Sequence, residues 1–328
     1  MPTSPMNSFA EMGLRGTSAP FLEVLKLIEK IAPYNTTVLL TGETGTGKDL
    51  VARAIHYFSG RKDCPFVPVN CGAIPDSLPE NEFFGHEKGA FTDAKESSAG
   101  LVAQAKSGTL FLDELEALSL RAQVTLLRFL QDHCFRPIGG KQVIHADVRV
   151  IAATNVDLQA MVGARSFRED LWFRLNVVSI NLPPLRERAG DAVLLADHFV
   201  RRYSCEYGKP IKALHPDAIA FLEAYPWPGN VRELENFIHR AFLLSDELVL
   251  KPSISMLGWS NSSDALTNGH ETFRVAKTRA IAVFEKTYLS ALLKKTEGNI
   301  TQAAKLSGQD RSVIGKLIKK HGLRQHPF

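Results

Sequence analysis

The chain has 328 residues, of which 45% are hydrophobic and 23% charged, and its formal net charge is +4. This composition can bury one large core or two ordinary ones, so we expect two domains or one domain with an appendage. No apolar run reaches the roughly 18 residues that a membrane span needs, no secretory signal is visible, and the four cysteines form no C-x-x-C pair. Membrane, secreted and zinc-stapled classes are therefore excluded, and we expect a cytoplasmic protein.

The charge is distributed unevenly along the chain. Residues 271–328 carry twelve Lys and Arg against four acidic residues, whereas the first 270 residues carry 27 against 31. A basic segment beside a mildly acidic body is typical of a nucleic-acid-binding module. A solvated, charged helix face is the alternative.

Five short apolar, β-branched runs alternate with helical patterns in the first half of the chain. The runs lie at 38–40, 66–69, 109–112, 148–153 and 177–180. This alternation predicts an α/β fold, a parallel sheet with helices on its faces. Beyond the Pro-Pro pair at 183–184 the periodicity is helical, for example at 191–207 and 231–244.

The expected organisation has five parts. They are an N-terminal tail (1–12), an α/β subdomain (13–185), a helical subdomain (186–250), a linker (251–270) and a helical C-terminal domain (271–328). The linker is rich in Ser, Asn and Gly and poor in charge, which is typical of a flexible connection.

A strand pattern, a glycine-rich loop and a helix pattern follow one another at residues 37–55. The loop consists of Gly42, Glu43, Thr44, Gly45, Thr46, Gly47, Lys48 and Asp49. Glycines let backbone N–H groups turn toward phosphates, the helix N-terminus adds its dipole, and Lys48 supplies a positive charge. We therefore predict a nucleotide site, with Asp49, where P-loops usually carry Ser or Thr, as a candidate Mg²⁺ ligand through water.

Two further strand ends supply polar groups. One apolar run ends in Asp113 and Glu114, and strand ends of open α/β sheets line the ligand crevice. We expect Asp113 to hold Mg²⁺ and Glu114 to polarise the attacking water, with a surface acidic turn as the alternative. Thr154 and Asn155 end another strand and are expected to sense the γ-phosphate. Together these residues predict ATP hydrolysis.

A loop with an aromatic residue between small ones follows Glu82. Phe91 has Ala90 before it and Thr92 after it, which makes a poor core segment. An exposed aromatic on a mobile loop favours a contact surface. A buried Phe that anchors the loop is the alternative.

Together these motifs resemble the sigma-54-dependent transcriptional activators (bacterial enhancer-binding proteins) of the AAA+ class, over residues 13–250 and more loosely over 271–323. The resemblance implies an AAA+ P-loop parallel sheet with a helical lid subdomain, plus a small all-α helix-turn-helix domain. It implies ATP and Mg²⁺ as cofactors and the sigma-54 RNA polymerase holoenzyme as a partner. The family's sigma-contact loop, G-A-F-T-G-A, corresponds to Gly89, Ala90, Phe91, Thr92, Asp93 and Ala94. Because Asp93 replaces the second glycine, a DNA-binding AAA+ regulator that no longer engages sigma-54 stays open as an alternative.

The resemblance implies further roles. Asn70 would restrain Glu114 until the partner engages. Arg168 and Arg174 would reach the ATP of a neighbouring subunit, with a salt bridge inside the helix as the alternative. Arg232, in Trp-Pro-Gly-Asn-Val-Arg-Glu-Leu, would reach the γ-phosphate from its own subunit. Active sites completed by a neighbour require a homo-oligomeric ring, a hexamer or a similar closed oligomer.

The C-terminus has the pattern of a helix-turn-helix at 298–308 and 310–320, and it resembles the Fis-type domain of this family. The predicted inner face comprises Ala303, Ala304, Leu306, Val313, Ile314, Leu317 and Ile318. The candidate residues for binding double-stranded DNA are Thr301, Arg311, Ser312, Lys316, Lys319 and Lys320, with Arg311 and Ser312 at the bases and the lysines at phosphates. A long helix at 273–295 would pair two such heads on a palindromic, enhancer-like site. A basic helical hairpin for oligomerisation is the alternative.

Few residues precede the first family-like segment at residue 13, which leaves no room for a sensor domain. We therefore expect control by a separate regulatory protein or by expression level. A P-loop kinase acting on a small substrate is the competing class of function. The arginine segment, the Phe91 loop and the basic C-terminus argue against it.

Overall fold

The computed structural model describes residues 5–92, 94–245 and 247–250, Leu289, Leu292, Leu293 and Thr296, and residues 299–307 and 311–320. Contacts divide the chain into two compact units, Met1–Pro252 and Ser253–Phe328. The boundaries predicted within these units remain predictions. Among the described residues, no helix is both long and apolar enough to cross a bilayer.

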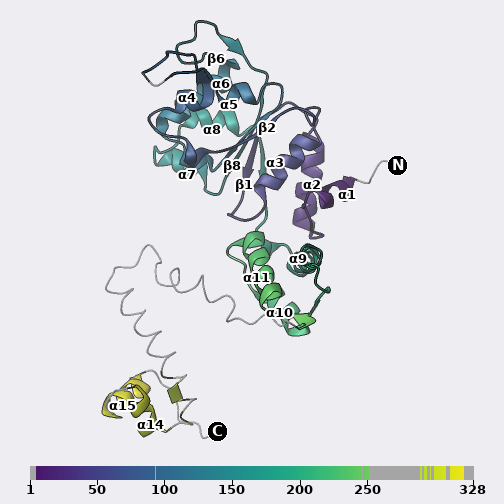
Figure 1. The fold of residues 1–328 in the computed structure, drawn as a ribbon, viewed down its shortest axis with the longest axis vertical. Helices are drawn as coiled ribbons and strands as arrows, with labels where there is room; N and C mark the ends of the chain where they lie inside the picture. The colour runs from purple at the N-terminus through teal and green to yellow at the C-terminus, as the bar shows by residue number, and fades with distance from the viewer. Residues whose placement is uncertain are drawn as a thin grey trace. The chain divides into compact units, whose positions relative to one another are not determined.

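A five-stranded parallel sheet forms the centre of the first unit (Figure 1). Its strands, in spatial order, are β2 (Phe66–Asn70), β5 (Thr109–Asp113), β8 (Arg149–Thr154), β1 (Val38–Thr41) and β9 (Val178–Asn181). Each of the five predicted runs forms one of these strands, which confirms the α/β prediction. The register pairs Thr41 with Thr154 and Asn70 with Asp113, so these strands end at the same edge of the sheet.

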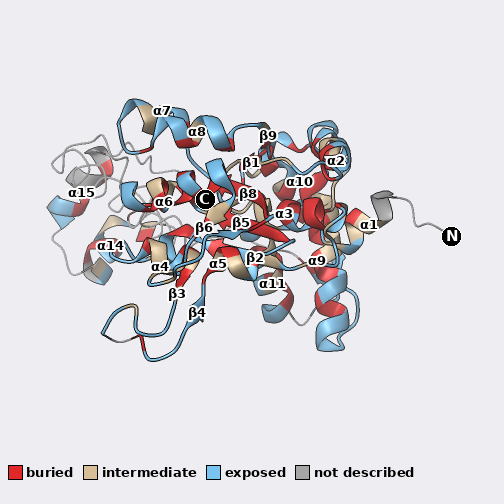
Figure 2. Cartoon of the chain, turned by 90° about the horizontal axis from the view of Figure 1, so that it is seen from above, coloured by how far each residue is buried: buried red, intermediate tan, exposed pale blue. Residues whose placement is uncertain are grey.

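Successive residues of each strand point to opposite faces, and each face carries its own core. Leu39, Leu110 and Leu112 belong to one core, whereas Leu40 and Phe111 belong to the other. A parallel sheet covered on both faces needs such continuously apolar strands, which is why the runs were visible in the sequence. Figure 2 shows the buried central strands β1, β5 and β8 with α4 and α6 on one side and α2 and α3 on the other.

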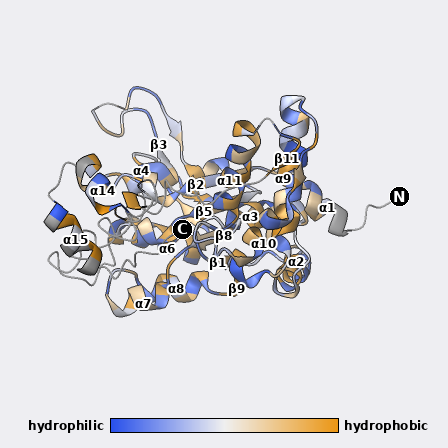
Figure 3. Ribbon diagram, turned by 90° about the horizontal axis from the view of Figure 1, so that it is seen from below, coloured by the Kyte–Doolittle hydropathy of each residue, from blue (hydrophilic) through white to orange (hydrophobic). Residues whose placement is uncertain are grey.

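The helices that cover the sheet are short and carry apolar and polar residues around their circumference (Figure 3). One face holds α4 (Pro79–Phe84), α5 (Leu101–Gln104), α6 (Leu120–Asp132), α7 (Leu158–Gly163) and α8 (Glu169–Leu175). The other face holds α1 (Pro5–Glu11), α2 (Ala19–Ile31) and α3 (Lys48–Tyr57). Short 3-10 helices follow two strands, namely η1 (Cys71–Ala73) and η2 (Leu115–Ala117).

The described residues of the predicted N-terminal tail are mostly helical. Residues expected at the end of a tail form α1, and Phe9 is fully buried with its ring centroid 4.6 Å from that of Phe58. Burying a side chain of this size contributes about 1.5–3 kcal/mol. Phe9 is therefore part of the core on the α2–α3 face of the sheet.

Two antiparallel ladders extend from the α4–α6 side of the sheet. They are β3 (Gly85–His86) with β4 (Ser98–Ala99), and β6 (Cys134–Phe135) with β7 (Ile144–His145). The loop between β3 and β4 projects from the unit as a largely exposed segment (Figure 2).

A helical subdomain follows the sheet. It begins with η3 (Leu185–Glu187) and contains α9 (Asp191–Tyr207), α10 (Pro216–Ala224), α11 (Asn230–Leu244) and a short pair of strands, β10 (Ala213–Leu214) and β11 (Val249–Leu250). Its helices form a separate group in Figure 1. The helical patterns predicted at 191–207 and 231–244 match α9 and α11.

The second unit contains the two helices predicted for the helix-turn-helix, α14 (Ile300–Ser307) and α15 (Arg311–Lys320). Ala304, Ile314 and Ile318 are buried with Leu289. Leu306 and Val313, predicted on the inner face, are 59% and 38% exposed. Leu306 lies about 60° around α14 from the buried Ala303, at the edge of the buried stripe, and Val313 lies about 100° around α15 from the buried Ile314. The predicted linker and most of the predicted helix at 273–295 lie outside the described residues.

Candidate active site

The loop between β1 and α3 is a phosphate-binding loop in its geometry. Gly45 and Gly47 have φ angles of +81° and +100°, which side-chain-bearing residues rarely adopt. A Cβ on Gly45 would lie 2.3 Å from the carbonyl oxygen of Gly229. Lys48 Nζ donates to the carbonyl oxygens of Gly42 at 2.7 Å and Glu43 at 3.1 Å, so its charge lies inside the loop.

A cavity of about 280 Å³ opens beside this loop. The described residues that line it come from the loop, the strand ends and the helical subdomain: Thr44, Gly45, Gly47, Lys48, Asp49, Leu50, Asp113, Glu114, Glu116, Asn155, Val231, Arg232 and Glu235. The structure thus brings together most of the residues predicted for a nucleotide site, although they come from four separate segments of the chain.

Electrostatics inside the cavity reflect partial burial. Burial lowers the pKa of the Lys48 ammonium, and the nearby Asp113 carboxylate opposes that shift. Burial raises the pKa of Asp113, while the Glu114 backbone N–H and Lys48 oppose the rise. The two groups therefore stabilise each other's charged form in a place where each alone would be costly.

Glu114 is held by a neighbouring strand. Its backbone has a φ of +54°, and its Oε2 accepts a hydrogen bond from Asn70 Nδ2 at 3.1 Å. Asn70 Oδ1 in turn accepts from the backbone N–H of Gly72 at 2.8 Å, which fixes the amide. The parallel register that pairs Asn70 with Asp113 makes this contact possible.

The carboxylates of the cavity fit Mg²⁺. Mg²⁺ prefers hard oxygen ligands and is usually bound by one or two carboxylates, with phosphates and water completing the shell. Asp113 fits that role because it lies beside Lys48 at the cavity wall. Asp49 lines the same cavity but forms an ion pair with Arg53, at 3.0 Å between Oδ2 and Nε. In the described part of the chain, no group of three His, Cys, Asp or Glu residues is arranged to hold a metal by itself.

Four residues predicted to bind the nucleotide do not line the cavity: Gly42, Glu43, Thr46 and Thr154. The Thr154 hydroxyl is buried and donates to Glu116 Oε2 at 2.7 Å, so the structure does not bring it to the phosphates. The Glu43 carboxylate contacts the helical subdomain instead, through Arg186 and Asn230. Asn155 does reach the cavity, where its Nδ2 donates to Thr44 Oγ1 at 3.3 Å.

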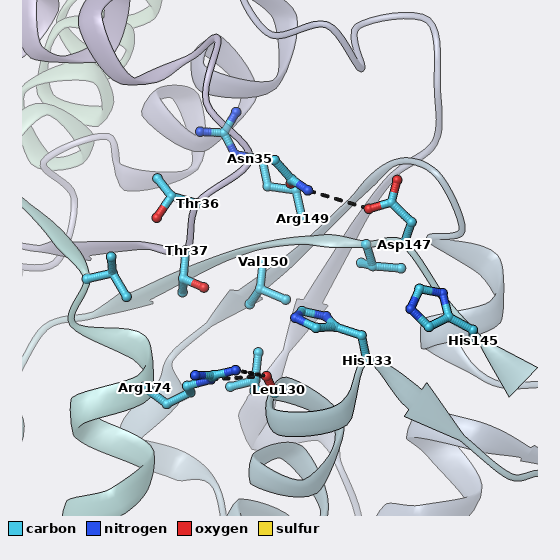
Figure 4. A pocket seen from close by; sticks show the side chains of 12 residues that line it. Asn35, Thr36, Thr37, Leu130, His133, His145, Asp147, Arg149, Val150 and Arg174 are labelled. Carbon is cyan, nitrogen blue, oxygen red and sulfur yellow. Dashed lines mark hydrogen bonds between the residues drawn. The ribbon is translucent and has the colours of Figure 1, made fainter. Parts of the chain in front are cut away.

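The predicted trans-acting arginines lie away from the P-loop cavity of their own chain. Arg168 makes a two-point contact with Asp170, with Nε–Oδ1 at 3.0 Å and Nη2–Oδ2 at 2.7 Å. Arg174 donates from Nε and Nη2 to the carbonyl oxygen of Leu130, at 3.1 and 2.9 Å. Figure 4 shows this contact at the wall of a second cavity of about 340 Å³.

The second cavity lies at the N-terminal ends of β1 and β8, whereas the P-loop cavity lies at the C-terminal ends of the strands. Its wall includes Arg149 (Figure 4). Arg149 is 2% exposed and donates to the carbonyl oxygens of Ala32 and Ile31 at the end of α2. Burial, together with nearby Arg61, lowers the pKa of Arg149 to about 10. Because helix C-termini carry partial negative charge, this guanidinium is explained as a cap of α2.

The predicted sigma-contact loop forms a tight turn. The Gly89 N–H donates to the Ala94 carbonyl oxygen at 2.8 Å, and the Ala94 N–H donates to Phe91 at 3.0 Å. Phe91 is 39% exposed, with its ring centroid 4.9 Å from that of His86. The predicted exposure of this aromatic side chain is therefore confirmed, while Asp93 lies outside the described residues.

In the second unit, Thr301 and Arg311 are exposed on α14 and α15. Ser312, Lys316, Lys319 and Lys320 lie on α15, but their side chains are outside the described part of the structure.

Three residues of the site were missed by sequence reasoning. Glu116 bonds Thr154, while Asn230 and Arg186 bond Glu43. Asn230 stands in the Gly-Asn pair of the motif around Arg232, and its φ of +53° is a conformation that Asn tolerates. The Gly-Asn pair is therefore the sequence feature that could have indicated a special role for Asn230.

A P-loop, carboxylates at a strand end and a helical subdomain that brings an arginine to the same cavity define the AAA+ class of fold. Three family models match the chain: the Sigma-54 interaction domain at residues 14–181, the AAA+ ATPase lid domain at 186–256, and the bacterial regulatory protein, Fis family, at 280–321. The chain belongs to the family of proteins with a Sigma-54 interaction domain.

Curated relatives agree with this membership. Nitrogen fixation protein VnfA of Azotobacter vinelandii is 44% identical over 327 residues, covering 98% of this chain and 61% of VnfA. Regulatory protein AtoC of Escherichia coli (strain K12) is 43% identical over 315 residues, covering 94% of this chain and 67% of AtoC. The chain thus spans about three fifths of the length of VnfA.

Solved structures agree on the fold. NtrX from Brucella abortus in complex with ADP has a TM-score of 0.71 and 34% identity, covering 95% of this chain and 69% of NtrX. A second structure of NtrX contains ATP, with a TM-score of 0.69, 35% identity, and coverage of 94% of this chain and 69% of NtrX. Hsp104 has a TM-score of 0.54 at 16% identity, covering 73% of this chain and 46% of Hsp104, which supports the AAA+ fold alone.

Proposed function

We propose that this chain is an ATP-hydrolysing transcriptional activator that binds upstream DNA and remodels the sigma-54 RNA polymerase holoenzyme for promoter opening. The observation that carries the proposal is the convergence of Lys48, Asp113, Glu114 and Arg232 on one cavity. Family membership supports sigma-54 as the partner, and the nucleotides bound by NtrX support ATP as the substrate.

In this proposal the P-loop and Lys48 bind the phosphates, and Asp113 would hold Mg²⁺, with Asp49 contributing through water. Mg²⁺ bound there would neutralise charge on the phosphate oxygens. Water attacks the γ-phosphorus, the bond to the bridging oxygen breaks with its electrons leaving on ADP, and Glu114 takes the proton of the water. Arg232 stabilises the phosphate charge from the same chain.

Asn70 controls when Glu114 acts. While Asn70 Nδ2 donates to Glu114 Oε2, that oxygen is occupied and the carboxylate is turned toward β2. Release of this contact frees the carboxylate to orient water. Partner engagement is the event that would release it, which couples turnover to sigma-54.

Arg168 and Arg174 complete the site of a neighbouring copy in a closed ring, such as a hexamer. To reach a neighbouring copy, each guanidinium group must break the contacts it makes in its own chain. Arg168 pairs with Asp170 at the surface, and Arg174 contacts a single carbonyl oxygen. An exposed pair such as that of Arg168 with Asp170 is worth at most about 1 kcal/mol, so a phosphate group can displace it.

The loop from Gly89 to Ala94 contacts sigma-54, and the second unit binds DNA. Exposure of Phe91 and of Arg311 supports these two assignments. The sequence feature that favours the alternative, a DNA-binding AAA+ regulator without sigma-54 engagement, is Asp93, which stands where the family's motif has its second glycine.

Promoter opening tests the proposal. Purified chain, sigma-54 holoenzyme and a promoter with its upstream site are mixed with ATP, and unpaired promoter thymines are detected by permanganate reactivity. We expect opening with ATP and none with ADP or with the Lys48→Ala variant. ATP hydrolysis without opening, at saturating chain, would favour the alternative regulator.

A further inference from the structure

Asn230 connects three separate parts of the first unit. It is the first residue of α11, it is completely buried, and its φ is +53°. Its Nδ2 donates to Glu43 Oε2 at 3.1 Å and to the Thr44 carbonyl oxygen at 3.0 Å. Its Oδ1 accepts from the backbone N–H of Leu185 at 2.8 Å. One amide therefore joins the P-loop, the start of the helical subdomain and the helix that carries Arg232.

These contacts are specific to an asparagine side chain. A buried amide needs donors and acceptors that match its oxygen and nitrogen, and this one has both. A positive φ is also easier for Asn than for most residues with side chains. Few other residues satisfy the backbone angle and the hydrogen bonds together.

Glu43 strengthens the connection from the side of the P-loop. Arg186 makes a two-point contact with its carboxylate, with Nη1–Oε2 at 2.8 Å and Nη2–Oε1 at 2.5 Å. Hydrogen bonds from Arg186 and then Asn230 lower the pKa of Glu43 to about 2, so it is ionised at neutral pH. The Arg186 pair is partly exposed and therefore screened by solvent. The Asn230 contact is partly buried and comes from a fully buried amide, so solvent screens it less than the Arg186 pair.

The same P-loop residues contact the cavity. The Thr44 carbonyl oxygen accepts from Asn230 Nδ2, and the Thr44 hydroxyl oxygen accepts from Asn155 Nδ2 at 3.3 Å. Beside it, the Gly45 carbonyl oxygen accepts from the Val231 N–H at 3.0 Å. Arg232 is the next residue on α11 and lines the cavity. A shift of Thr44 or Gly45 is therefore transmitted directly to the helix turn that carries Arg232.

We infer that Asn230, together with Glu43 and Arg186, is a positioning group that links P-loop conformation to the placement of Arg232 at the nucleotide phosphates. The inference rests on the proposed function for its consequence in turnover. Asn230 does not line the cavity and acts through Arg232 and the P-loop. It makes the helical subdomain respond to what the P-loop binds.

Steady-state ATP hydrolysis by the full chain tests this link. Asn230→Asp keeps the shape of the side chain but replaces both donors with a carboxylate next to Glu43. We expect kcat to fall about tenfold or more, because a small misplacement of a catalytic group has effects of that size, with a change in KM of less than about threefold. The matched control is Arg201→Gln, which removes an exposed ion pair with Asp197 on α9 of the same subdomain, and we expect its kcat to be unchanged.

A rescue separates positioning from general damage. In the double variant Glu43→Gln/Asn230→Asp, the amide introduced at position 43 can donate to the carboxylate introduced at position 230. We expect kcat to recover by at least about threefold relative to Asn230→Asp. An unchanged kcat in Asn230→Asp would overturn the inference, as would equal losses in Asn230→Asp and in the control.

Amide hydrogen exchange gives a readout that does not depend on hydrolysis. We expect faster exchange of the Val231 amide in Asn230→Asp and native exchange in Arg201→Gln. If the unaltered chain hydrolyses no ATP, the proposed function fails, and exchange at Val231 still decides the link. If Asn230→Asp does not fold, both measurements are made on Arg186→Gln, where we expect about a threefold loss of kcat and faster Val231 exchange. Native kcat and exchange in that variant would overturn the inference.

Discussion

Asn70 Nδ2 donates to Glu114 Oε2 across a distance of 3.1 Å, from the end of β2 to the residue that follows β5. The two strands are neighbours in the sheet, and their register sets Asn70 beside Asp113. The amide is fixed by the Gly72 N–H. The contact thus holds the proposed water-activating carboxylate in a defined position.

We predict that Asn70→Ala raises ATP hydrolysis in the absence of sigma-54 by about fivefold. A hydrogen bond to a charged group is worth about 1.5–3 kcal/mol when buried and less at an exposed position such as this one, which leaves about 1 kcal/mol. Steady-state phosphate release measures the rate of ATP hydrolysis. Asn35→Ala, which removes an amide contact to Asp147 elsewhere, is the control. Unchanged basal turnover in Asn70→Ala would mean that the contact restrains nothing.

Glu114→Gln should separate binding from hydrolysis. The amide keeps the size of the side chain but cannot take a proton, so we expect turnover to fall by about 100-fold or more. ATP affinity should change little, because Lys48 and the P-loop are untouched. Equilibrium binding of a fluorescent ATP analogue and single-turnover hydrolysis measure the two effects. Glu29→Gln, at an exposed position of α2, controls for loss of one charge; equal rates in the two variants would remove Glu114 from the mechanism.

Parts of this site were predictable from sequence because they depend on local order. Strands of a doubly covered sheet are apolar runs, and their carboxyl ends meet at one edge, so Lys48, Asp113 and Glu114 could be brought together by topology alone. The directions of the Glu43 and Thr154 side chains could not be predicted in this way. Their directions are decided by partners such as Asn230, 187 positions from Glu43, and by Glu116, whose contact no local pattern indicates.

In the second unit, too, local patterns were predictable from the sequence and packing between elements was not. The two helices were visible from their periodicity, whereas the exposure of Leu306 and Val313 depends on which stripe packs inward. Ala304, Ile314 and Ile318 define that stripe. Helix packing angles are not encoded in a single helix pattern, so an apolar residue beside the stripe was assigned to it wrongly.

Asp191 ties the N-terminal segment to the start of the helical subdomain. It is completely buried and accepts from Thr17 N at 2.7 Å, Ser18 Oγ at 2.8 Å and Arg188 Nε at 2.9 Å. Asp191→Asn should lower the free energy of unfolding by about 3 kcal/mol, because it leaves a buried guanidinium without its partner. Asp197→Asn, which breaks an exposed pair with Arg201, should cost far less, because water screens exposed ion pairs. Urea unfolding compares them, and equal costs would contradict the assignment.

The same residue predicts an acid dependence. Burial alone would raise the pKa of Asp191, but hydrogen bonds from Thr17, Ser18 and Arg188 together hold it below the ordinary value of 3.8. A group with a lowered folded-state pKa contributes stability above its unfolded value and loses it as the pH falls. Urea midpoints should therefore drop below about pH 4, and the drop should be smaller in Asp191→Asn. An identical acid slope in both proteins would contradict this.

Arg311 is the described residue best placed for base contact, since it is exposed at the first position of α15. Arg311→Ala should weaken binding to a specific site by about 1–3 kcal/mol and relax preference at one base pair. Binding to a panel of single-base variants of that site, measured by fluorescence anisotropy at fixed salt, checks it. A uniform loss across all sequences would instead mark Arg311 as a phosphate contact.

Capture of sigma-54 tests the central proposal most directly. Purified chain is mixed with sigma-54 and ADP, with and without a metal-fluoride mimic of the transferring phosphoryl group, and the complex is separated by size. We predict capture only with the mimic, lost in Phe91→Ala while that variant keeps native ATP hydrolysis. Absence of capture from a chain that hydrolyses ATP, or capture that Phe91→Ala leaves intact, would contradict the assignment of the loop from Gly89 to Ala94.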